Sequence, residues 1–186
     1  MGLHCPTLTT VDVIPRVIGL VGPAGAGKDT VASMLQTGWD YNPIALATPI
    51  KTFVEDLLGP GKHRRAYQLI GDVIRGENPH AFIHVVQKIL NWDGRRWVIT
   101  DIRYPNELEA FRVYGPLWYV ETPPAVRQAR LKARDGSAGH LAHASEAVEP
   151  LRALCDVVIA NAGSKLELTE QIGIHLRWRW EDSPPQ

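Results

Sequence analysis

The chain has 186 residues, which is about the size of one domain and too short for two full ones. Lys and Arg together number 20, as do Asp and Glu, so no global charge draws the protein toward nucleic acid or an acidic membrane. The two cysteines give neither a disulfide framework nor metal-ligand spacing, and no apolar run approaches the roughly 20 residues that a membrane-spanning helix needs. We therefore expect a single cytoplasmic domain over 1–186, with frayed tails at 1–12 and 181–186. The oligomeric state stays open, a homodimer included.

A glycine-rich stretch lies between two apolar runs, 17–21 and 31–35, and reads Gly-Pro-Ala-Gly-Ala-Gly-Lys-Asp-Thr. A buried strand that breaks into such a turn and then opens a helix is the context of a phosphate-binding P-loop. The glycines let consecutive backbone N–H groups face an anion, the helix adds its positive dipole end, and the lysine reaches the outer phosphates. The sequence thus predicts a nucleotide-binding loop made of Gly22, Ala24, Gly25, Ala26, Gly27, Lys28, Asp29 and Thr30.

One position departs from the usual P-loop pattern. Ser or Thr directly after the lysine is the customary magnesium ligand, whereas this chain has Asp29 there and Thr30 next. We therefore expect magnesium to be held partly through water, with Asp29 or Thr30 close by. The alternative is an ordinary glycine-rich turn between strand and helix, but such a turn does not require a lysine at position 28.

Strand and helix signals alternate along the whole chain, which is an α/β pattern. Residues 44–47 form a short apolar run that predicts a strand, and 50–58 predicts a helix closed by Gly-Pro-Gly. Lys51 lies in the first turn of that helix, where a cation is unfavourable. An acceptor phosphate would explain its placement, and a solvated surface lysine would explain it equally well.

The segment 64–75 predicts a helix with one chemical face. At about 100° per residue, Arg64, Gln68, Gly71 and Arg75 fall within a stripe of about 60°. The opposite, apolar side comprises Ala66, Leu69, Ile70, Val73 and Ile74. A glycine inside a helix costs roughly 1 kcal/mol against Ala, which makes sense if something must approach the backbone there. The stripe suits a phosphate and a base edge, and a solvated amphipathic face is the alternative.

A helix over 80–91 follows, and the apolar run 97–100 then ends in Asp101. A hydrophobic strand followed by an acid lets the carboxylate face magnesium or substrate at the carboxyl end of the strand. Asp101 is therefore the candidate acid, with a simple strand-end turn as the alternative. Arg103 either pairs with Asp101 or reaches a phosphate. A further helix begins near Pro105, and 117–120 predicts another strand.

The helix after Thr-Pro-Pro at 122–124 carries a basic face. Arg127, Arg130 and Arg134 are spaced three and four apart, and none has a carboxylate four residues away to neutralise it. We expect them to close over the transferring phosphate as part of a lid at about 123–145, with a solvated charge run as the alternative. His140, His143 and Glu146 share a helical spacing, but the glycine-rich sequence before them favours a loop over a metal site.

The last elements are a buried strand at 157–159, a turn of Asn-Ala-Gly-Ser and a closing helix over 166–178. In this architecture the loop after the last strand often lies beside the base of the phosphate donor. Asn161, the first residue of that turn, therefore joins the predicted nucleotide-binding set.

Four blocks of the chain resemble the deoxynucleoside monophosphate kinases of bacteriophages. They are the P-loop with Gly-Lys-Asp-Thr, the stripe on 64–75, the run Ile-Thr-Asp-Ile-Arg-Tyr-Pro-Asn-Glu that ends in Asn106 and Glu107, and the segment 156–164. The resemblance spans most of the chain, and the third block is the one that points to this family. Dephospho-coenzyme A kinases resemble the last block nearly as well, which makes them the second candidate.

This resemblance implies a P-loop kinase fold, a parallel sheet with helices on both faces, and magnesium-dependent transfer of the γ-phosphate of ATP to a deoxynucleoside monophosphate. By the same matching, Lys28 and the glycine loop hold the donor, and the three lid arginines close over it. The acceptor would be held by Arg64, Gln68, Arg75 and Arg103. A nucleotide switch of the GTPase class should carry Asn-Lys-x-Asp, which this chain lacks. Neutral charge and short length argue against a nucleic-acid motor.

Overall fold

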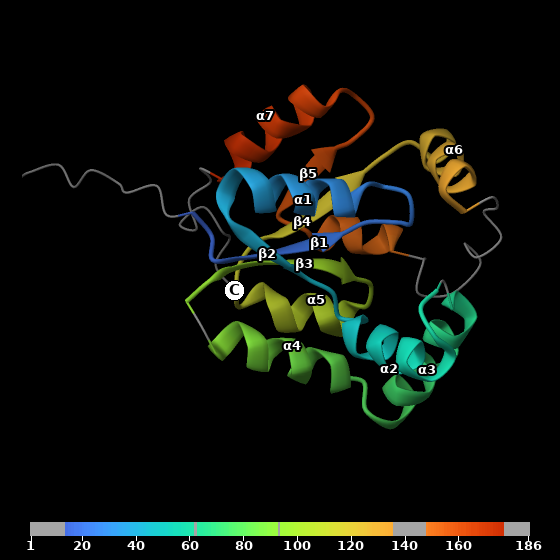
Figure 1. Cartoon of the computed structure of the whole chain (residues 1–186). Helices are drawn as coiled ribbons and strands as arrows, with labels where there is room; N and C mark the ends of the chain where they lie inside the picture. Colours follow the sequence, from blue (N-terminus) through green and yellow to red (C-terminus); the bar gives the residue numbers. More distant parts are fainter. Residues whose placement is uncertain (1–13, 62, 93, 136–147, 177–186) are drawn as a thin grey trace, which may run out of the picture.

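The computed structural model describes residues 14–61, 63–92, 94–135 and 148–176. Within these ranges one five-stranded, all-parallel sheet forms in the order β2-β3-β1-β4-β5 (Figure 1). The strands are β1 (Val17–Val21), β2 (Tyr41–Ile44), β3 (Arg96–Ile102), β4 (Leu117–Glu121) and β5 (Val157–Ala160). Because β1 is the central strand, the P-loop that follows it lies in the middle of the carboxyl edge of the sheet.

Helices cover both faces of this sheet (Figure 1). On one face lie α1 (Lys28–Trp39) and α7 (Lys165–Leu176), and on the other lie α4 (Ala81–Trp92) and α5 (Pro105–Arg112). The carboxyl edge is surrounded by α2 (Thr48–Leu58), α3 (Arg64–Glu77) and α6 (Pro124–Asp135). A 3-10 helix, η3 (Glu149–Leu154), packs Leu151 into the same hydrophobic layer as α4 and α5.

Two hydrophobic layers sandwich the sheet. Ile18 and Leu20 of β1 belong to the layer under α1 and α7, whereas Val17 and Val21 belong to the layer under α4 and α5. Successive residues of a strand point to opposite faces of the sheet, and helices cover both faces, so all four side chains are buried. A strand covered on both faces needs apolar residues at every position, which is why β1 and β4 read as continuous apolar runs in the sequence.

The predicted fold class, a parallel sheet with helices on both faces, is confirmed. Two predicted details are wrong. The strand predicted at 44–47 lies at Tyr41–Ile44, because the amides of Leu46 and Ala47 donate to the Asp101 carboxylate and so cannot join the sheet. In α3, only part of the predicted apolar face is buried: Ala66, Ile70 and Ile74 pack against the core, whereas Leu69 and Val73 are 64% and 62% exposed.

Among the described residues, no helix combines the length and apolar character needed to cross a membrane. The same residues contain no group of three or more His, Cys, Asp or Glu side chains that could hold a metal ion. The disfavoured metal candidates His140, His143 and Glu146 lie outside the described residues, as do the two predicted tails and residues 136–145 of the predicted lid.

Candidate active site

The P-loop runs from the end of β1 to the start of α1. Gly25 and Gly27 have φ angles of 77° and 92°, in the left-handed region where a side chain is strained. A Cβ on Gly27 would also lie 2.1 Å from Nδ2 of Asn161, so neither the backbone nor the space admits another residue. α1 begins at Lys28, and the N-terminal, positive end of its dipole therefore adjoins the loop.

The Lys28 side chain folds back over this loop. Its Nζ donates hydrogen bonds to the carbonyl oxygen of Gly22 and, at 3.3 Å, to that of Pro23. The residue also lines the cavity next to the loop. The ammonium group thus lies at the mouth of the loop, where a phosphate would replace neutral carbonyl partners with a stronger, charged one.

A cavity of about 720 Å³ opens between the P-loop, α2, α3, the end of β3 and α6. This volume is typical of a site for a small molecule. The cavity brings together most of the predicted site residues, although they are far apart in the sequence. On its wall lie Ala24, Gly25, Gly27, Lys28, Asp29, Thr30, Lys51, Gln68, Arg75, Asp101, Arg103, Arg130 and Arg134.

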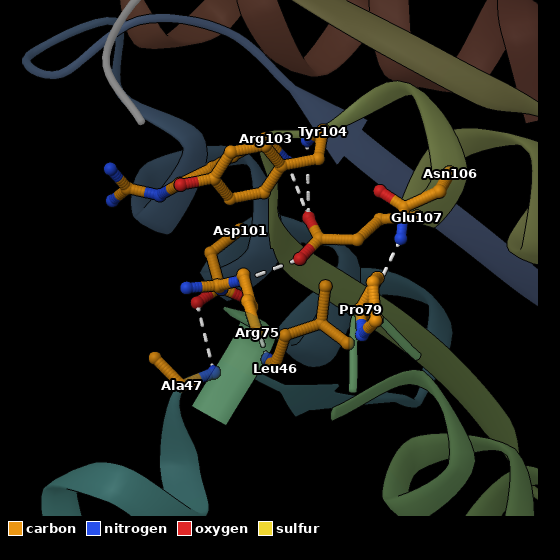
Figure 2. A network of polar contacts seen from close by, with 9 residues as sticks. All are labelled: Leu46, Ala47, Arg75, Pro79, Asp101, Arg103, Tyr104, Asn106 and Glu107. Atoms are coloured by element: carbon orange, nitrogen blue, oxygen red, sulfur yellow. Dashed lines mark hydrogen bonds and ion pairs between the residues drawn. The ribbon is translucent and has the colours of Figure 1, made fainter. Parts of the chain in front are cut away.

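Arg75 of α3 is enclosed by side chains from three other segments. Its guanidinium carbon lies 4.8 Å from the centre of the Phe82 ring and 4.7 Å from that of the Tyr104 ring. Its Nη2 lies 3.4 Å from Oε1 of Glu107 (Figure 2), and its side chain is 21% exposed. Its Nε is buried without a hydrogen-bond partner in the described structure. The orientation of this guanidinium is therefore fixed by the protein, with its remaining exposed part toward the cavity.

Glu107 organises the turn between β3 and α5. Its Oε2 accepts hydrogen bonds from the amides of Arg103 at 2.9 Å and Tyr104 at 3.2 Å, as the third residue of a capping box does (Figure 2). Burial raises the pKa of the Glu107 carboxyl, while the Arg103 amide and the Arg75 charge act in the opposite direction. Asn106, next in the same turn, donates to the carbonyl oxygen of Pro79 at 2.9 Å and so ties α5 to the segment before α4.

Asp101 lies near the end of β3 and lines the cavity. Its two carboxylate oxygens accept hydrogen bonds from the amides of Leu46 at 2.6 Å and Ala47 at 3.2 Å (Figure 2). Asp101 therefore fixes the connection between β2 and α2, and each oxygen keeps a second lone pair for a ligand. Asp29 and Thr30 line the same cavity, and hard oxygen donors of this kind fit a magnesium ion that keeps several of its waters.

Asn161 lies against the back of the P-loop rather than in the cavity. Its buried amide donates to the carbonyl oxygen of Ala26 at 2.8 Å, and the Thr122 hydroxyl donates to the same oxygen at 2.9 Å. Ala26 itself is fully buried. The structure thus gives Asn161 a supporting position beneath the loop, and its side chain does not line the cavity.

The three arginines predicted to form a lid do not share one environment. Arg130 and Arg134 line the cavity, and Nη2 of Arg130 donates to the carbonyl oxygen of Asn161 at 3.1 Å. Arg127 does not line it: its Nη2 lies 3.7 Å from Oε1 of Glu149 in η3. The expectation of an unpaired basic face is therefore wrong for Arg127, because its partner comes from a later element that helical spacing does not reveal.

The remaining three predicted residues of the acceptor side differ in their surroundings. Lys51 lines the cavity, as an acceptor-binding lysine should. Arg64 begins α3, but its side chain is outside what the structure describes. Gly71 is buried, and a Cβ there would lie 3.0 Å from Nη1 of Arg75 and 3.2 Å from Cδ1 of Ile50. What approaches the Gly71 backbone is thus the protein itself.

Sequence reasoning missed several residues of this site. Glu55, Tyr67 and Asp72 line the cavity, but they do not belong to any sequence motif that would have identified them. The aromatic partners of Arg75 were missed because they come from α4 and from the turn after β3, which only the tertiary fold brings together. The helical spacing of Gln68, Asp72 and Arg75 could have identified Asp72.

Known proteins resemble this chain in sequence and in structure. A ribose 1,5-bisphosphate phosphokinase, PhnN, of Bradyrhizobium diazoefficiens is 31% identical over 162 residues, which cover 80% of this chain and 81% of that protein. The chain belongs to the P-loop kinase family of this relative. It is accordingly a small-molecule kinase. No family model matches the chain.

Solved structures agree with the fold of this P-loop kinase. TT1252 from Thermus thermophilus has a TM-score of 0.61 at 24% identity, over 88% of this chain and 97% of that one. The shikimate kinase of Acinetobacter baumannii has a TM-score of 0.54 at 20% identity, over 87% of this chain and 92% of that one. A gluconokinase of Sinorhizobium meliloti has a TM-score of 0.55 at 15% identity, over 88% of this chain and 92% of that one. At these identities the likeness establishes the fold alone.

Proposed function

We propose that this P-loop kinase transfers the γ-phosphate of ATP to the phosphate of a deoxynucleoside monophosphate, giving a deoxynucleoside diphosphate and ADP. The observation that carries the proposal is the position of two sequence blocks. Gln68 and Arg75 of the stripe on α3, and Asp101 and Arg103 of the run that ends at Glu107, line one cavity with Lys28, and both blocks carry the resemblance to phage deoxynucleoside monophosphate kinases. Donor and acceptor groups would therefore share one site.

On the donor side, the N–H groups of the glycine loop and the start of α1 suit the β- and γ-phosphates of ATP. Lys28 supplies a positive charge at the mouth of the loop. Magnesium, when bound, would neutralise the phosphate charge, held through Asp29, Thr30 and Asp101 partly by water. These three residues line the cavity with the oxygen ligands that such an ion requires.

On the acceptor side, the wall offers cations for a phosphate and neutral groups for a base. Arg75, Arg103 and Lys51 provide the positive charge. Gln68 presents both a donor and an acceptor, which is what reading a base edge requires, and the neighbouring Tyr67 offers a ring. Phosphoryl transfer needs little more than positioning and charge neutralisation, and Arg130 and Arg134 on α6 are placed to supply the latter.

Ribose 1,5-bisphosphate is a second candidate acceptor, because the relative named above is a ribose 1,5-bisphosphate phosphokinase. Ribose 1,5-bisphosphate also carries phosphate groups, so the cationic wall fits it as well. It has no base, so it offers no base edge for the Gln68 amide to read. Dephospho-coenzyme A remains the third candidate, on the resemblance of the last strand and its turn.

Steady-state kinetics with ATP, magnesium and a panel of acceptors tests the proposal. The panel comprises the deoxynucleoside monophosphates, their ribose counterparts, ribose 1,5-bisphosphate and dephospho-coenzyme A. We expect a deoxynucleoside monophosphate to have the highest kcat/KM, and Gln68→Ala to change the ranking of bases, whereas Gln87→Ala on α4 should not. Preference for ribose 1,5-bisphosphate, with no turnover of any nucleotide, would overturn the proposal.

A further inference from the structure

The enclosure of Arg75 is more elaborate than a surface arginine requires. Aromatic rings of Phe82 and Tyr104 lie on its guanidinium at 4.8 and 4.7 Å, and Glu107 faces one edge. An arginine side chain normally loses substantial rotamer freedom when it grips a ligand. Here that freedom is already lost in the folded protein. Arg75 is thus preorganised to donate hydrogen bonds to two oxygens of an oxyanion, such as a phosphate group, on the cavity side.

Glu107 connects this arginine to a second one. One of its oxygens faces Nη2 of Arg75, and the other accepts the backbone amide of Arg103 (Figure 2). Both arginines line the cavity. A single carboxylate therefore sets the position of Arg75 through its side chain and of Arg103 through its backbone.

The negative charge of Glu107 is not explained by its capping role alone. A capping box works with Glu or Gln at this third position, because it needs only an oxygen that reaches back to the backbone amides. Burial of an ionised carboxylate is costly, whereas burial of a neutral amide in the same hydrogen bonds costs less. Arg75 is the cation that the structure places against this carboxylate.

We infer that Glu107 is a positioning residue of the phosphoryl-transfer site: its carboxylate holds Arg75 and Arg103 as a rigid pair that grips the phosphate of the acceptor. This inference rests on the proposed function only in requiring an acceptor that carries a phosphate. Glu107 is 2% exposed and acts through the arginines rather than by touching the substrate.

The test compares Glu107→Gln with Glu109→Gln, which removes an exposed carboxylate from the same helix. Glu107→Gln keeps the oxygen for the capping box and loses the charge facing Arg75. We expect it to lower kcat/KM for the acceptor by about 100-fold, the effect of misplacing a substrate by roughly 1 Å, while the KM for ATP stays near that of Glu109→Gln. A purely structural role would instead lower the melting temperature and affect both substrates alike.

A double-mutant cycle with Arg75→Lys separates positioning from general damage. Lysine keeps the positive charge but lacks the two-pronged geometry, so Arg75→Lys alone should also lower kcat/KM for the acceptor and spare ATP. If Glu107 acts through Arg75, the double variant should be little worse than either single variant. Losses that multiply, or a Glu107→Gln protein as active as Glu109→Gln, would overturn the inference. Should Glu107→Gln fail to fold, an Arg75→Lys protein with unchanged acceptor kinetics would overturn it as well.

The inference and the proposed function can fail separately. The cycle is run with whichever phosphorylated acceptor the wild-type protein uses best. If that acceptor is ribose 1,5-bisphosphate and the coupling is present, the proposed function fails and the inference stands. If a deoxynucleoside monophosphate is phosphorylated and the coupling is absent, the inference fails and the proposed function stands.

Discussion

The side-chain amide of Asn161 donates a hydrogen bond to the carbonyl oxygen of Ala26, 2.8 Å away, and thereby ties the turn after β5 to the middle of the P-loop. The hydroxyl of Thr122, at the end of β4, donates to the same oxygen at 2.9 Å and to the carbonyl oxygen of Asn161 at 3.1 Å. The ends of two neighbouring strands thus support the loop from below. The shape of the phosphate site depends on residues that no bound phosphate need touch.

Asn161→Ala should therefore weaken both stability and nucleotide binding. The loss of one buried hydrogen bond should lower the free energy of unfolding by about 1 kcal/mol, because Thr122 still satisfies the Ala26 oxygen. The KM for ATP should rise, since the loop loses one of its supports. Urea denaturation and steady-state kinetics measure the two effects, with Asn91→Ala on the exposed part of α4 as the control. A stable variant with an unchanged KM for ATP would contradict this role.

The arginines of α6 should differ in what their loss changes. Arg134 lines the cavity, so Arg134→Ala should lower kcat more than it weakens ATP binding. Arg127 pairs with Glu149, so Arg127→Ala should keep nearly normal kcat and lower the free energy of unfolding by about 0.5–1 kcal/mol. Lys132→Ala, on an exposed position of α6, controls for the loss of a charge. Equal kinetic effects of Arg127→Ala and Arg134→Ala would contradict this division and show that the two arginines act together, as their helical spacing alone suggests.

Two glycines of α3 provide a matched pair. A Cβ at Gly76 would meet no atom within 4 Å, so Gly76→Ala should raise the free energy of unfolding by up to about 1 kcal/mol. A Cβ at Gly71 would crowd Nη1 of Arg75 and Cδ1 of Ile50, which should offset the same gain. Gly71→Ala should also raise the KM of the acceptor by displacing Arg75. Thermal unfolding and acceptor kinetics decide: a Gly71→Ala protein that matches Gly76→Ala in both would show that Arg75 gives way easily.

His175 should make stability depend on pH. Burial lowers its pKa below the ordinary value of 6.5, so the unfolded chain binds a proton more readily than the folded protein. The free energy of unfolding contributed by this histidine is therefore fully present above pH 6.5 and declines as the pH falls through that value toward the folded pKa. We expect His175→Gln to remove this decline. Urea denaturation of both proteins at pH 8 and pH 5 measures this decline. If the wild-type protein and His175→Gln differed in free energy of unfolding by the same amount at both pH values, the assignment would be contradicted.

The sequence predicted well those features whose signals are local. The P-loop is a short motif in which the glycines, the lysine and the flanking apolar runs follow one another. Strands buried on both faces, such as β1 and β4, can also be recognised in the sequence as apolar runs. The convergence of Lys28 and Asp101 on one cavity follows from a parallel sheet, since β1 and β3 end at the same edge.

The features that the sequence did not reveal depend on partners far along the chain. Leu46 and Ala47 look like a strand, but the carboxylate of Asp101 accepts their amides. Arg127 looks unpaired, but Glu149 reaches it from η3. Helical periodicity placed Leu69 and Val73 in the core because it cannot show how far α3 is rotated against α2. Each error has the same cause, a tertiary contact that overrides a local pattern.

The fate of the γ-phosphate tests most sharply whether this kinase phosphorylates deoxynucleoside monophosphates. ATP labelled in that phosphate is incubated with magnesium, the protein and an equimolar mixture of deoxynucleoside monophosphates and ribose 1,5-bisphosphate, and the labelled products are separated. We expect the label to appear in a deoxynucleoside diphosphate. Lys28→Ala, correctly folded by circular dichroism, should transfer almost none, because the charge aimed at the phosphate is gone. Label in a sugar phosphate product, or in inorganic phosphate alone, would contradict the proposed function.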